Sequence, residues 1–258
     1  MARGDAVGGF VAGSLQTEAH RLAVAREEDR LQLPGTQTMT PAGRGLTTIL
    51  AGLAGVATVI VVIGLTVALF FNPLWIAFEQ ERAGVPAITG YTSDQVGAVT
   101  SSILADLFFG PPAFAVAVNG QPVLDSAERS HMVDVRSVLL PVTILFDVAL
   151  ALLVVLLADK RRSAWIWRAI ARASSVLALV GIVVGLAVVF FFDAAFLLFH
   201  LVFFPQGNFS FDPRTQRLTQ LFPDQFWTET SIAIAIVGLA IAVPVGLVAR
   251  RRAARLPD

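Results

Sequence analysis

Four long apolar runs constrain this chain more than any other feature of its sequence. They cover residues 47–71, 138–158, 174–204 and 231–248. A helix needs about 20 apolar residues to cross a bilayer core of about 30 Å, and each run approaches or exceeds that length. Because backbone polar groups in lipid must be satisfied within the segment itself, the sequence predicts an all-α membrane protein with four transmembrane helices.

The overall composition agrees with a membrane protein and excludes several kinds of chemistry. Hydrophobic residues make up 55% of the 258 residues and charged residues 15%, which is too apolar for an ordinary soluble domain. The chain has no cysteine, which excludes disulfides, thiolate nucleophiles and cysteine-ligated metals. The first apolar run starts too far from Met1, and is too long, to be a cleaved signal sequence. We predict no cofactor and no nucleic-acid partner.

Basic residues indicate which side of the membrane each segment faces. They crowd the link between the second and third runs and follow the fourth run: Lys160, Arg161, Arg162, Arg168 and Arg172, then Arg250, Arg251, Arg252 and Arg255. By the positive-inside rule both segments are cytoplasmic. An even number of spans then places the N-terminus in the cytoplasm as well. We predict a multi-pass protein of a bacterial plasma membrane.

The polar segments complete the predicted organisation. Residues 1–46 form a cytoplasmic tail that is predicted to be disordered, and residues 250–258 form a short basic tail. The transmembrane domain covers residues 47–249. Within it, an outer cap at 72–137 and an outer loop at 205–230 lie on the extracytoplasmic side, so any activity is expected there.

The segment 72–137 has the patterns of a small folded cap. Residues 92–93 can cap a helix whose apolar positions recur at helical spacing. An Asn-Gly turn at 119–120 lies between two short extended runs, which is typical of a β-hairpin. Asp125 with Glu128 three residues later matches a capping box, which would open the helix of the second span.

Two histidines are the best candidates for chemistry. His131 precedes the second run and His200 lies near the end of the third, so the topology brings both to the outer face at similar depth. Glu128 and Asp134 are each three residues from His131 and can approach its ring on one helix. A single interfacial histidine is commonly a packing or snorkelling residue. Two on one face with carboxylates nearby favour a function, because ionisable groups in membranes are costly.

Two further acidic residues lie within the apolar runs. Asp193 is seven residues before His200, about 10 Å deeper along a straight helix, from where it can reach Arg136 or another group on a neighbouring helix. We place it among the supporting residues. Asp147, near the middle of the second run, is predicted to face the bundle interior, protonated or paired with Thr143.

Two blocks of the sequence resemble the signature of a known family. The first is ERSHMVDVR at 128–136, and the second is FDAAFLLFHLVFFPQGNFSFDPRTQRLTQLFPDQFW at 192–227. Together they resemble a bacterial family of four-span integral membrane proteins whose characterised member is the lipoprotein intramolecular transacylase. The matching positions include Glu128, His131, Asp134, Asp193, His200, Gly207 and Asn208. The chain departs from the family pattern at Phe209, where tryptophan is common.

The resemblance implies an enzyme that moves an acyl chain from the sn-2 ester of a diacylglyceryl-cysteine to the α-amine of the same cysteine. Membrane lipid and lipoproteins would then be its partners. We hypothesise that His131 and His200 act as acid and base, in either order. The supporting set comprises Glu128 and Asp134, which would orient His131, and Arg136 and Asn208, which would stabilise the oxyanion. Five phenylalanines would line the acyl chains, although lipid contact explains them equally well: Phe199, Phe203, Phe204, Phe209 and Phe211.

Three other functions compete with this hypothesis. The first is a non-enzymatic scaffold or subunit that binds a partner through its outer loop, and the second is a small channel or transporter. The third is a zinc site built from the two histidines and a carboxylate, but the usual ligand spacing is absent and we predict no metal. Histidine side chains within about 4 to 8 Å of each other around an outward cavity favour catalysis, and a separation beyond about 12 Å favours a structural role.

Overall fold

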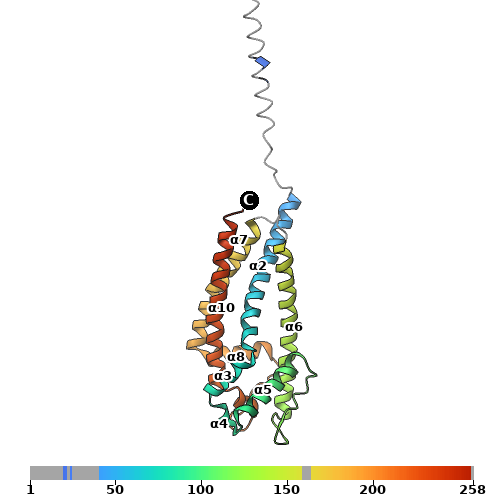
Figure 1. Cartoon of the computed structure of the whole chain (residues 1–258), viewed down its shortest axis with the longest axis vertical. Coiled ribbons are helices and arrows are strands. Elements are labelled where there is room, and N and C mark those ends of the chain that lie inside the picture. The colour runs from blue at the N-terminus through green and yellow to red at the C-terminus, as the bar shows by residue number, and fades with distance from the viewer. Residues whose placement is uncertain (1–19, 22–23, 25–40, 159–163, 257–258) are drawn as a thin grey trace, which may run out of the picture. The chain divides into compact units, whose positions relative to one another are not determined.

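The computed structural model describes residues 20–21, 24, 41–158 and 164–256. The chain divides into two units, Met1–Thr47 and Thr48–Asp258. Most of the predicted disordered tail and the basic residues 160–162 lie outside the described residues. The elements, labelled as in Figure 1, are α2 (Pro41–Phe70), α3 (Pro73–Arg82), α4 (Val85–Thr89), α5 (Ser93–Phe108), β1 (Ala117–Val118), β2 (Gln121–Pro122), α6 (Ser126–Ala158), α7 (Ala164–Phe190), α8 (Phe192–Phe203), α9 (Arg217–Leu221) and α10 (Asp224–Ala253).

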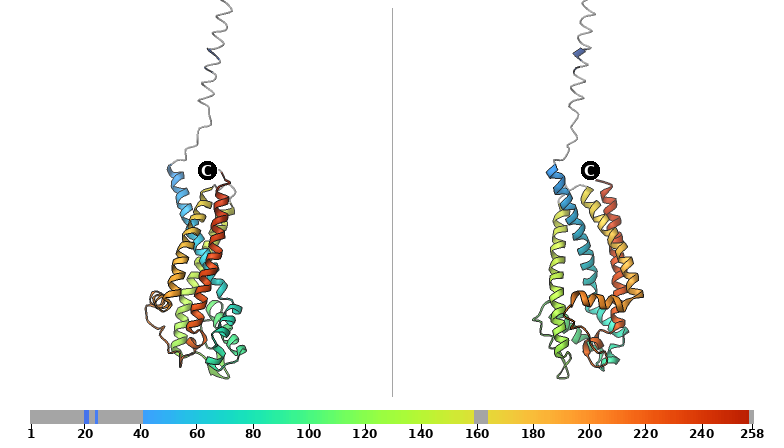
Figure 2. Two further views of the ribbon diagram at one scale, coloured as in Figure 1. Left: turned by 90° about the vertical axis from the view of Figure 1, so that its left-hand side faces the viewer. Right: turned by 180° about the vertical axis from the view of Figure 1, so that it is seen from behind.

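Four of the described helices, α2, α6, α7 and α10, are long and apolar enough to cross a membrane, which confirms the predicted number of spans. They run alongside one another in the second unit (Figures 1 and 2). Their outer sides leave large apolar side chains uncovered. On α6, for example, Ile144, Val148 and Val155 are 62%, 59% and 63% exposed. Such a surface suits contact with lipid tails rather than water.

The third apolar run differs from the prediction of one continuous span at 174–204. Its helix α7 begins at Ala164 and ends at Phe190, and a separate helix α8 follows after Phe191, which has non-helical backbone angles (φ −137°, ψ 42°). Figure 2 shows α8 turned across the bundle rather than continuing along α7. No proline or glycine marks this break, because residues 190–192 are all phenylalanine.

Small residues allow close contact between the long helices. On α7, a Cβ atom added to Gly185 would lie 3.1 Å from the Cβ of Ala235 on α10, and one on Gly246 of α10 would lie 3.3 Å from the Cβ of Ser174. On α2, a Cβ at Gly64 would fall 2.3 Å from the Phe146 ring of α6. The absence of side chains at these glycines therefore sets how closely the helices pack.

The segment between α2 and α6 forms three short helices and a hairpin. The Thr92 side chain accepts a hydrogen bond from the Gln95 amide in a capping box that opens α5, and β1 pairs with β2 in an antiparallel hairpin. At the start of α6, Asp125 and Glu128 form the predicted capping box through reciprocal bonds to each other's backbone amides. A buried apolar cluster joins α4, α5, the hairpin, α6 and α9: Val85, Val96, Val99, Ile103, Leu107, Phe114, Val118, Val123, Leu124, Met132, Leu218 and Leu221.

Asp147 does not face the bundle interior as predicted. Its side chain is exposed on α6, and Thr143 donates its hydroxyl hydrogen bond to the Leu139 carbonyl rather than to Asp147. The physical reason is that α6 turns most of this stretch outward, with Ile144 and Leu145 also exposed on either side.

Candidate active site

The two histidines of the sequence hypothesis lie together. His131, in the second turn of α6, and His200, near the end of α8, stack with ring centroids 6.2 Å apart and an interplanar angle of 24°. This separation falls within the range expected for two groups that share one reacting centre. Both rings are nearly buried, at 6% and 8% exposure. Helix α8 turns across the bundle instead of continuing the third span (Figure 2), and its His200 stacks on His131 of α6.

The tautomer of His200 is set by its own helix. Its Nδ1 atom lies 2.8 Å from the carbonyl oxygen of Phe196, one turn earlier. A carbonyl oxygen can only accept a hydrogen bond, so Nδ1 must carry the proton. In the neutral ring Nε2 then has a free lone pair, which is the form a general base requires.

A short polar chain leads from His131 to a carboxylate. Two of the buried atoms without a hydrogen-bond partner in the described part of the chain lie here, Nδ1 of His131 and Oδ1 of Asn208. The Asn208 side chain interacts with the His131 ring, and its amide nitrogen donates to Oδ2 of Asp134. The two unpaired atoms are complementary, because a ring N–H can donate and an amide oxygen can accept. Gln206 also donates to Asp134 Oδ2, at 3.0 Å, which fixes this carboxylate against the loop after α8.

Glu128 does not orient the His131 ring as predicted, but binds the backbone. Its carboxylate is buried, with Oε2 accepting from the Asp125 amide at 2.7 Å and Oε1 from the Leu218 amide at 2.6 Å. The side chain therefore fixes the start of α6 against α9. Glu128 holds the backbone that carries His131, and the direct polar contact of the ring is Asn208.

Arg136 and Asp193 have separate surroundings, and neither joins the histidine pair. The guanidinium of Arg136 donates to the carbonyl oxygen of Asp106 on α5, and this bond ties α5 to α6. Asp193 is exposed in the first turn of α8, where a negative charge is favourable at a helix N-terminus. Neither residue contacts the histidine rings within the described part of the chain.

Aromatic rings enclose the histidine pair. Phe204 contacts both rings, with centroids 4.9 Å from His131 and 5.7 Å from His200. Phe211 lies 5.5 Å from His131, and Phe209 lies 5.0 Å from His200. Of the other predicted lining residues, Phe199 contacts His200 edge-on at 5.3 Å and is half exposed, whereas Phe203 packs on Phe199 and is 42% exposed.

Phe196 is the site residue that the sequence hypothesis missed. Its ring is only 4.2 Å from the ring of His200, in addition to the bond that its carbonyl accepts. Its position four residues before a histidine on one helix is the signal that could have identified it, because such residues face each other.

The sequence matches a family model described as the lipoprotein intramolecular transacylase Lit over residues 52–227. The chain belongs to the Lit family. The match spans both histidine blocks and all four long helices in part or in full. No curated protein matches the sequence.

Solved structures of the transacylase Lit from Bacillus cereus share the fold of this Lit-family chain. One is 18% identical with a TM-score of 0.68, and covers 82% of this chain and 97% of its own. Two others carry a histidine-to-arginine and a histidine-to-alanine mutation. Each is 17% identical with a TM-score of 0.64; the first covers 88% of this chain and 96% of its own, and the second 80% and 93%.

The described residues of this Lit-family chain contain no group of three histidine, aspartate or glutamate side chains placed to hold a metal ion. Glu128 directs both carboxylate oxygens to backbone amides. Asp134 accepts two amide hydrogen bonds from the loop after α8. The carboxylates that the zinc alternative required are thus engaged in other bonds.

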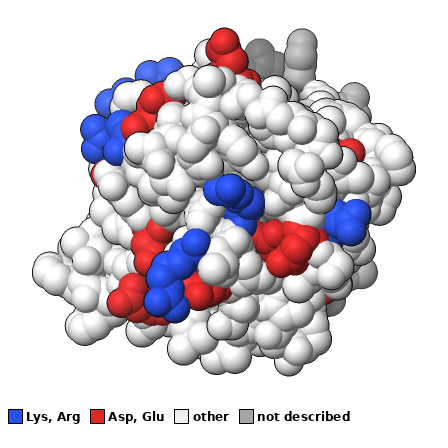
Figure 3. All heavy atoms as spheres, turned by 90° about the horizontal axis from the view of Figure 1, so that it is seen from below, with Lys and Arg blue, Asp and Glu red and all other residues white. Residues whose placement is uncertain are grey.

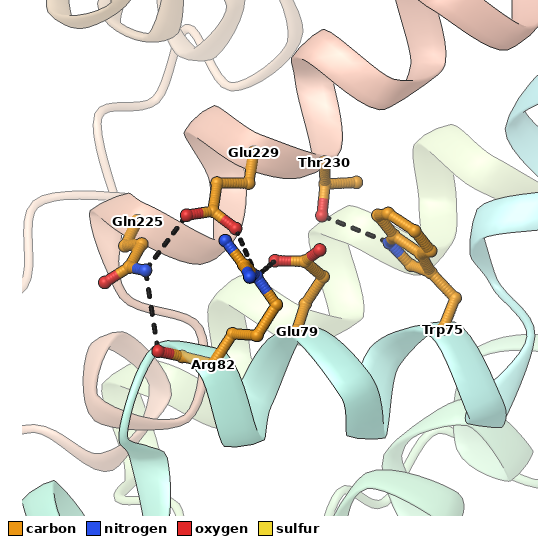
Figure 4. A network of polar contacts seen from close by, with 6 residues as sticks. All are labelled: Trp75, Glu79, Arg82, Gln225, Glu229 and Thr230. Atoms are coloured by element: carbon orange, nitrogen blue, oxygen red, sulfur yellow. Dashed lines mark hydrogen bonds and ion pairs between the residues drawn. The ribbon is translucent and has the colours of Figure 1, made fainter.

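A second polar network joins α3 to α10 (Figure 4). Arg82 donates to Glu229 with Nε and Oε2 2.8 Å apart, while the same nitrogen is 3.9 Å from Oε2 of Glu79, too far for a hydrogen bond. Trp75 donates to the hydroxyl of Thr230 at 3.3 Å. Burial of the Glu79 carboxyl, together with the adjacent Glu229, raises the pKa of Glu79 to about 7.

The surface formed by the short helices and loops carries charges of both signs. Figure 3 shows acidic and basic side chains next to one another in several places, and uncharged surface lies between these places. In the loop after α8, Arg214 pairs with Asp212 at 3.1 Å and holds the pKa of that carboxyl below its ordinary value.

Proposed function

We propose that this Lit-family protein transfers an acyl chain within a lipoprotein, from the sn-2 ester of its diacylglyceryl-cysteine to the α-amine of that cysteine. The observation that carries the proposal is the stacked histidine pair, 6.2 Å apart and enclosed by phenylalanines. It supplies two proton-transfer groups beside an apolar surface. Membership of the Lit family supports the same reaction.

The chemistry requires proton transfer more than it requires a protein nucleophile. The α-amine, with an ordinary pKa of about 7.7 to 8.0, must lose a proton before its nitrogen can attack the ester carbonyl. A carbon–nitrogen bond forms, the bond from the carbonyl carbon to the sn-2 oxygen breaks, and the released alkoxide takes up a proton. Because amine and ester belong to one molecule, the protein mainly has to hold them in an attack geometry.

The two rings suit different halves of this transfer. His200 is the base in our proposal, because the Phe196 carbonyl keeps its proton on Nδ1 and leaves Nε2 free. His131 is the acid that returns a proton to the alkoxide. Its polar neighbours Asn208 and Asp134 can hold the ring in one orientation for this transfer.

We also propose that the reaction takes place on the extracytoplasmic side of the plasma membrane. The basic residues after α10 and between α6 and α7 support a cytoplasmic location for the opposite end of the bundle. The folded segment between α2 and α6 would then be an extracytoplasmic cap above the histidine pair, and both chain termini would be cytoplasmic.

Two single substitutions test the proposed function. The full-length protein is expressed in a lipoprotein-processing host that lacks its own transacylase, and the N-terminus of a reporter lipoprotein is analysed by mass spectrometry. We expect the N-acyl lyso product with the wild type, and a loss of about a hundredfold or more with His131→Gln and with His200→Gln. General acid–base groups contribute about 10² to 10⁴ in rate.

His20→Gln is the matched control, because it replaces an exposed histidine of the first unit. It should leave the product unchanged. Membrane insertion and folding of all three variants are checked by their melting temperatures in detergent. Unchanged product in both site variants would contradict the enzymatic proposal. It would favour the scaffold alternative, in which glutamine at either position should have little effect.

A further inference from the structure

An open pocket lies between α7 and α10 at the end of the bundle away from α8. Its volume is about 490 Å³, and its lining comprises Arg168, Ala171, Arg172, Ser175, Val176, Arg250 and Ala253. Figure 1 shows the C-terminal end of α10 beside the first part of α7, which brings these residues together. Among the described residues, the lining contains three arginines and no acidic residue.

Two of the arginines are held in place by neutral groups. The guanidinium of Arg250 donates to the Ser175 hydroxyl at 2.8 Å, and that hydroxyl donates to the Ala171 carbonyl at 2.7 Å. Arg172 makes a long contact of 3.4 Å from Nε to the Arg168 carbonyl. Within the described part of the chain, neither Arg172 nor Arg250 takes part in an ion pair. Arg172 and Arg250 therefore place two positive charges at one pocket, and like charges repel one another unless an anion lies between them.

The depth of the pocket matches the level of lipid headgroups. Arg172 lies 18 residues before Phe190, the last residue of α7, and 18 helical residues span about 27 Å. A bilayer core is about 30 Å thick, so the two ends of this stretch reach opposite interfaces. The histidine pair is near one interface, and the pocket is near the other.

Apolar side chains continue from the pocket toward the middle of the membrane. Val176, itself in the lining, is 60% exposed, and Leu179 one turn further along α7 is 64% exposed. On α10, Leu247 lies one turn before Arg250 and is 49% exposed. A ligand with a phosphate head and acyl tails could therefore contact the arginines and this apolar surface together.

We propose that this pocket binds the phosphate headgroup of an anionic glycerophospholipid in the leaflet opposite the histidine site. Arg172 and Arg250 provide charge-assisted hydrogen bonds to the phosphate oxygens, and Ser175 keeps the Arg250 guanidinium directed into the pocket. The acyl chains lie along Val176 and Leu179. This binding does not depend on the transacylase reaction.

Two general effects also place arginines at this end of the chain. Cytoplasmic loops are rich in basic residues, and cations at a helix C-terminus interact favourably with the helix dipole. Both effects apply to Arg250, Arg251 and Arg252, which lie in the last turn of α10; Arg251 and Arg252 lie outside the pocket lining. They do not explain why Arg172, within α7, faces Arg250 across a pocket. The pair Arg251 and Arg252 is therefore a matched control.

Lipid titration of the full-length protein tests the proposal. Protein purified in neutral detergent is titrated with phosphatidylglycerol or phosphatidylcholine, and bound lipid is counted by native mass spectrometry while the melting temperature is followed. We expect preferential binding of phosphatidylglycerol. Arg172→Gln combined with Arg250→Gln should weaken its apparent Kd by about tenfold or more, because charge-assisted bonds to phosphate are lost. Arg251→Gln combined with Arg252→Gln removes the same net charge and should leave Kd within about twofold.

Three results would overturn the proposal: equal weakening in both double variants, equal affinity for the two lipids, or inorganic phosphate alone raising the melting temperature as much as phosphatidylglycerol. The last result would identify a free anion rather than a lipid as the ligand. Ser175→Ala provides a second test if the pocket double variant does not fold. It keeps every charge and should weaken phosphatidylglycerol binding to a smaller extent, whereas an unchanged Kd would contradict the assigned role of Ser175.

Discussion

The polar neighbour of each histidine determines which of its nitrogen atoms is available for chemistry. For His200 the neighbour is a backbone carbonyl, and for His131 it is the Asn208 side chain, held in turn by Asp134. A carbonyl of the same helix is present wherever that helix forms. An asparagine from the loop after α8 is present only when the loop folds against α6. The two rings are therefore controlled by different parts of the chain.

Asn208→Ala tests this control of His131. The change removes the amide that interacts with the His131 ring and breaks the link to Asp134, but it leaves both rings in place. We expect the rate of acyl transfer to fall by about ten- to a hundredfold, less than with loss of the ring itself, because an orienting partner supplies only part of the acid–base contribution. The rate is measured as product per time by mass spectrometry.

Thr215→Ala is a suitable control for Asn208, because it alters an exposed side chain of the same loop. It should leave the rate unchanged. If the pH–rate profile of Asn208→Ala is shifted relative to the wild type, the residue acts through the protonation of His131. A lower rate with an identical profile and a lower melting temperature would instead indicate that Asn208 only stabilises the loop.

Glu79 makes the stability of the protein depend on pH. The folded chain keeps the Glu79 proton up to a pKa of about 7, whereas the unfolded chain releases it near 4.5. Folding therefore takes up a proton between these values, and the free energy of unfolding falls as the pH rises from about 4.5 to 7. Arg82 does not prevent this loss of stability, because its guanidinium donates its short hydrogen bond to Glu229 and not to the Glu79 carboxylate.

Glu79→Gln should remove this dependence, since the amide can donate to Glu229 as the protonated acid does. We expect the melting temperature of the variant to exceed that of the wild type at pH 8 and to approach it at about pH 4.5, measured in detergent across this range. Glu81→Gln changes an exposed neighbour on α3 and should give no such pH-dependent difference. A constant difference for Glu79→Gln would contradict the raised pKa.

At the scale of helices, the contact of α2 with α6 depends on the missing side chain of Gly64. A Cβ there would lie 2.3 Å from the Phe146 ring, whereas one at Gly52 on the same helix would have no atom within 4 Å. Gly64→Ala should lower the free energy of unfolding by about 1 to 3 kcal/mol, the usual cost of overpacking. Gly52→Ala should be neutral or stabilising, because alanine favours a helix over glycine. Thermal unfolding in detergent compares the two, and equal effects would rule out the proposed clash.

Local sequence patterns predicted several elements because short-range bonds determine them. The capping boxes at Thr92 and Asp125, the 119–120 hairpin turn and the four long helices all depend on residues close in the chain. The approach of His131 to His200 followed from topology alone. The break at Phe191 was not predictable, because a run of phenylalanines reads equally well as one long helix or as two.

The roles of the polar side chains were harder to predict. Glu128 is close enough to His131 in sequence to orient it, but the amides of Asp125 and Leu218 take both of its oxygens, and Leu218 is 90 residues away. Asp147 was expected inside the bundle, yet hydropathy does not show which side of a uniformly apolar helix faces lipid. Long-range partners and helix rotation are properties of packing, which a single sequence does not determine.

At the scale of the whole molecule, the absence of cysteine allows a clean test of membrane orientation. Thr215→Cys places a thiol in the loop after α8, and Ala254→Cys places one after α10. In intact cells a membrane-impermeant maleimide should label the first and not the second. Labelling of both is expected after permeabilisation, and the unsubstituted chain should give no signal. The reverse pattern in intact cells would invert the proposed topology.

The short length of α8 has a consequence for how the rate of such an enzyme should be measured. Twelve residues span about 18 Å, so this apolar helix cannot cross a bilayer. In the proposed topology, its position across the bundle keeps the histidine site at the level where lipid esters meet water. A substrate can then reach the ring by diffusing in the plane of the membrane. Turnover should follow the mole fraction of substrate among the lipids rather than its bulk concentration. Diluting a lipoprotein with inert lipid should slow the reaction, while diluting the vesicles with buffer should leave the rate per enzyme unchanged.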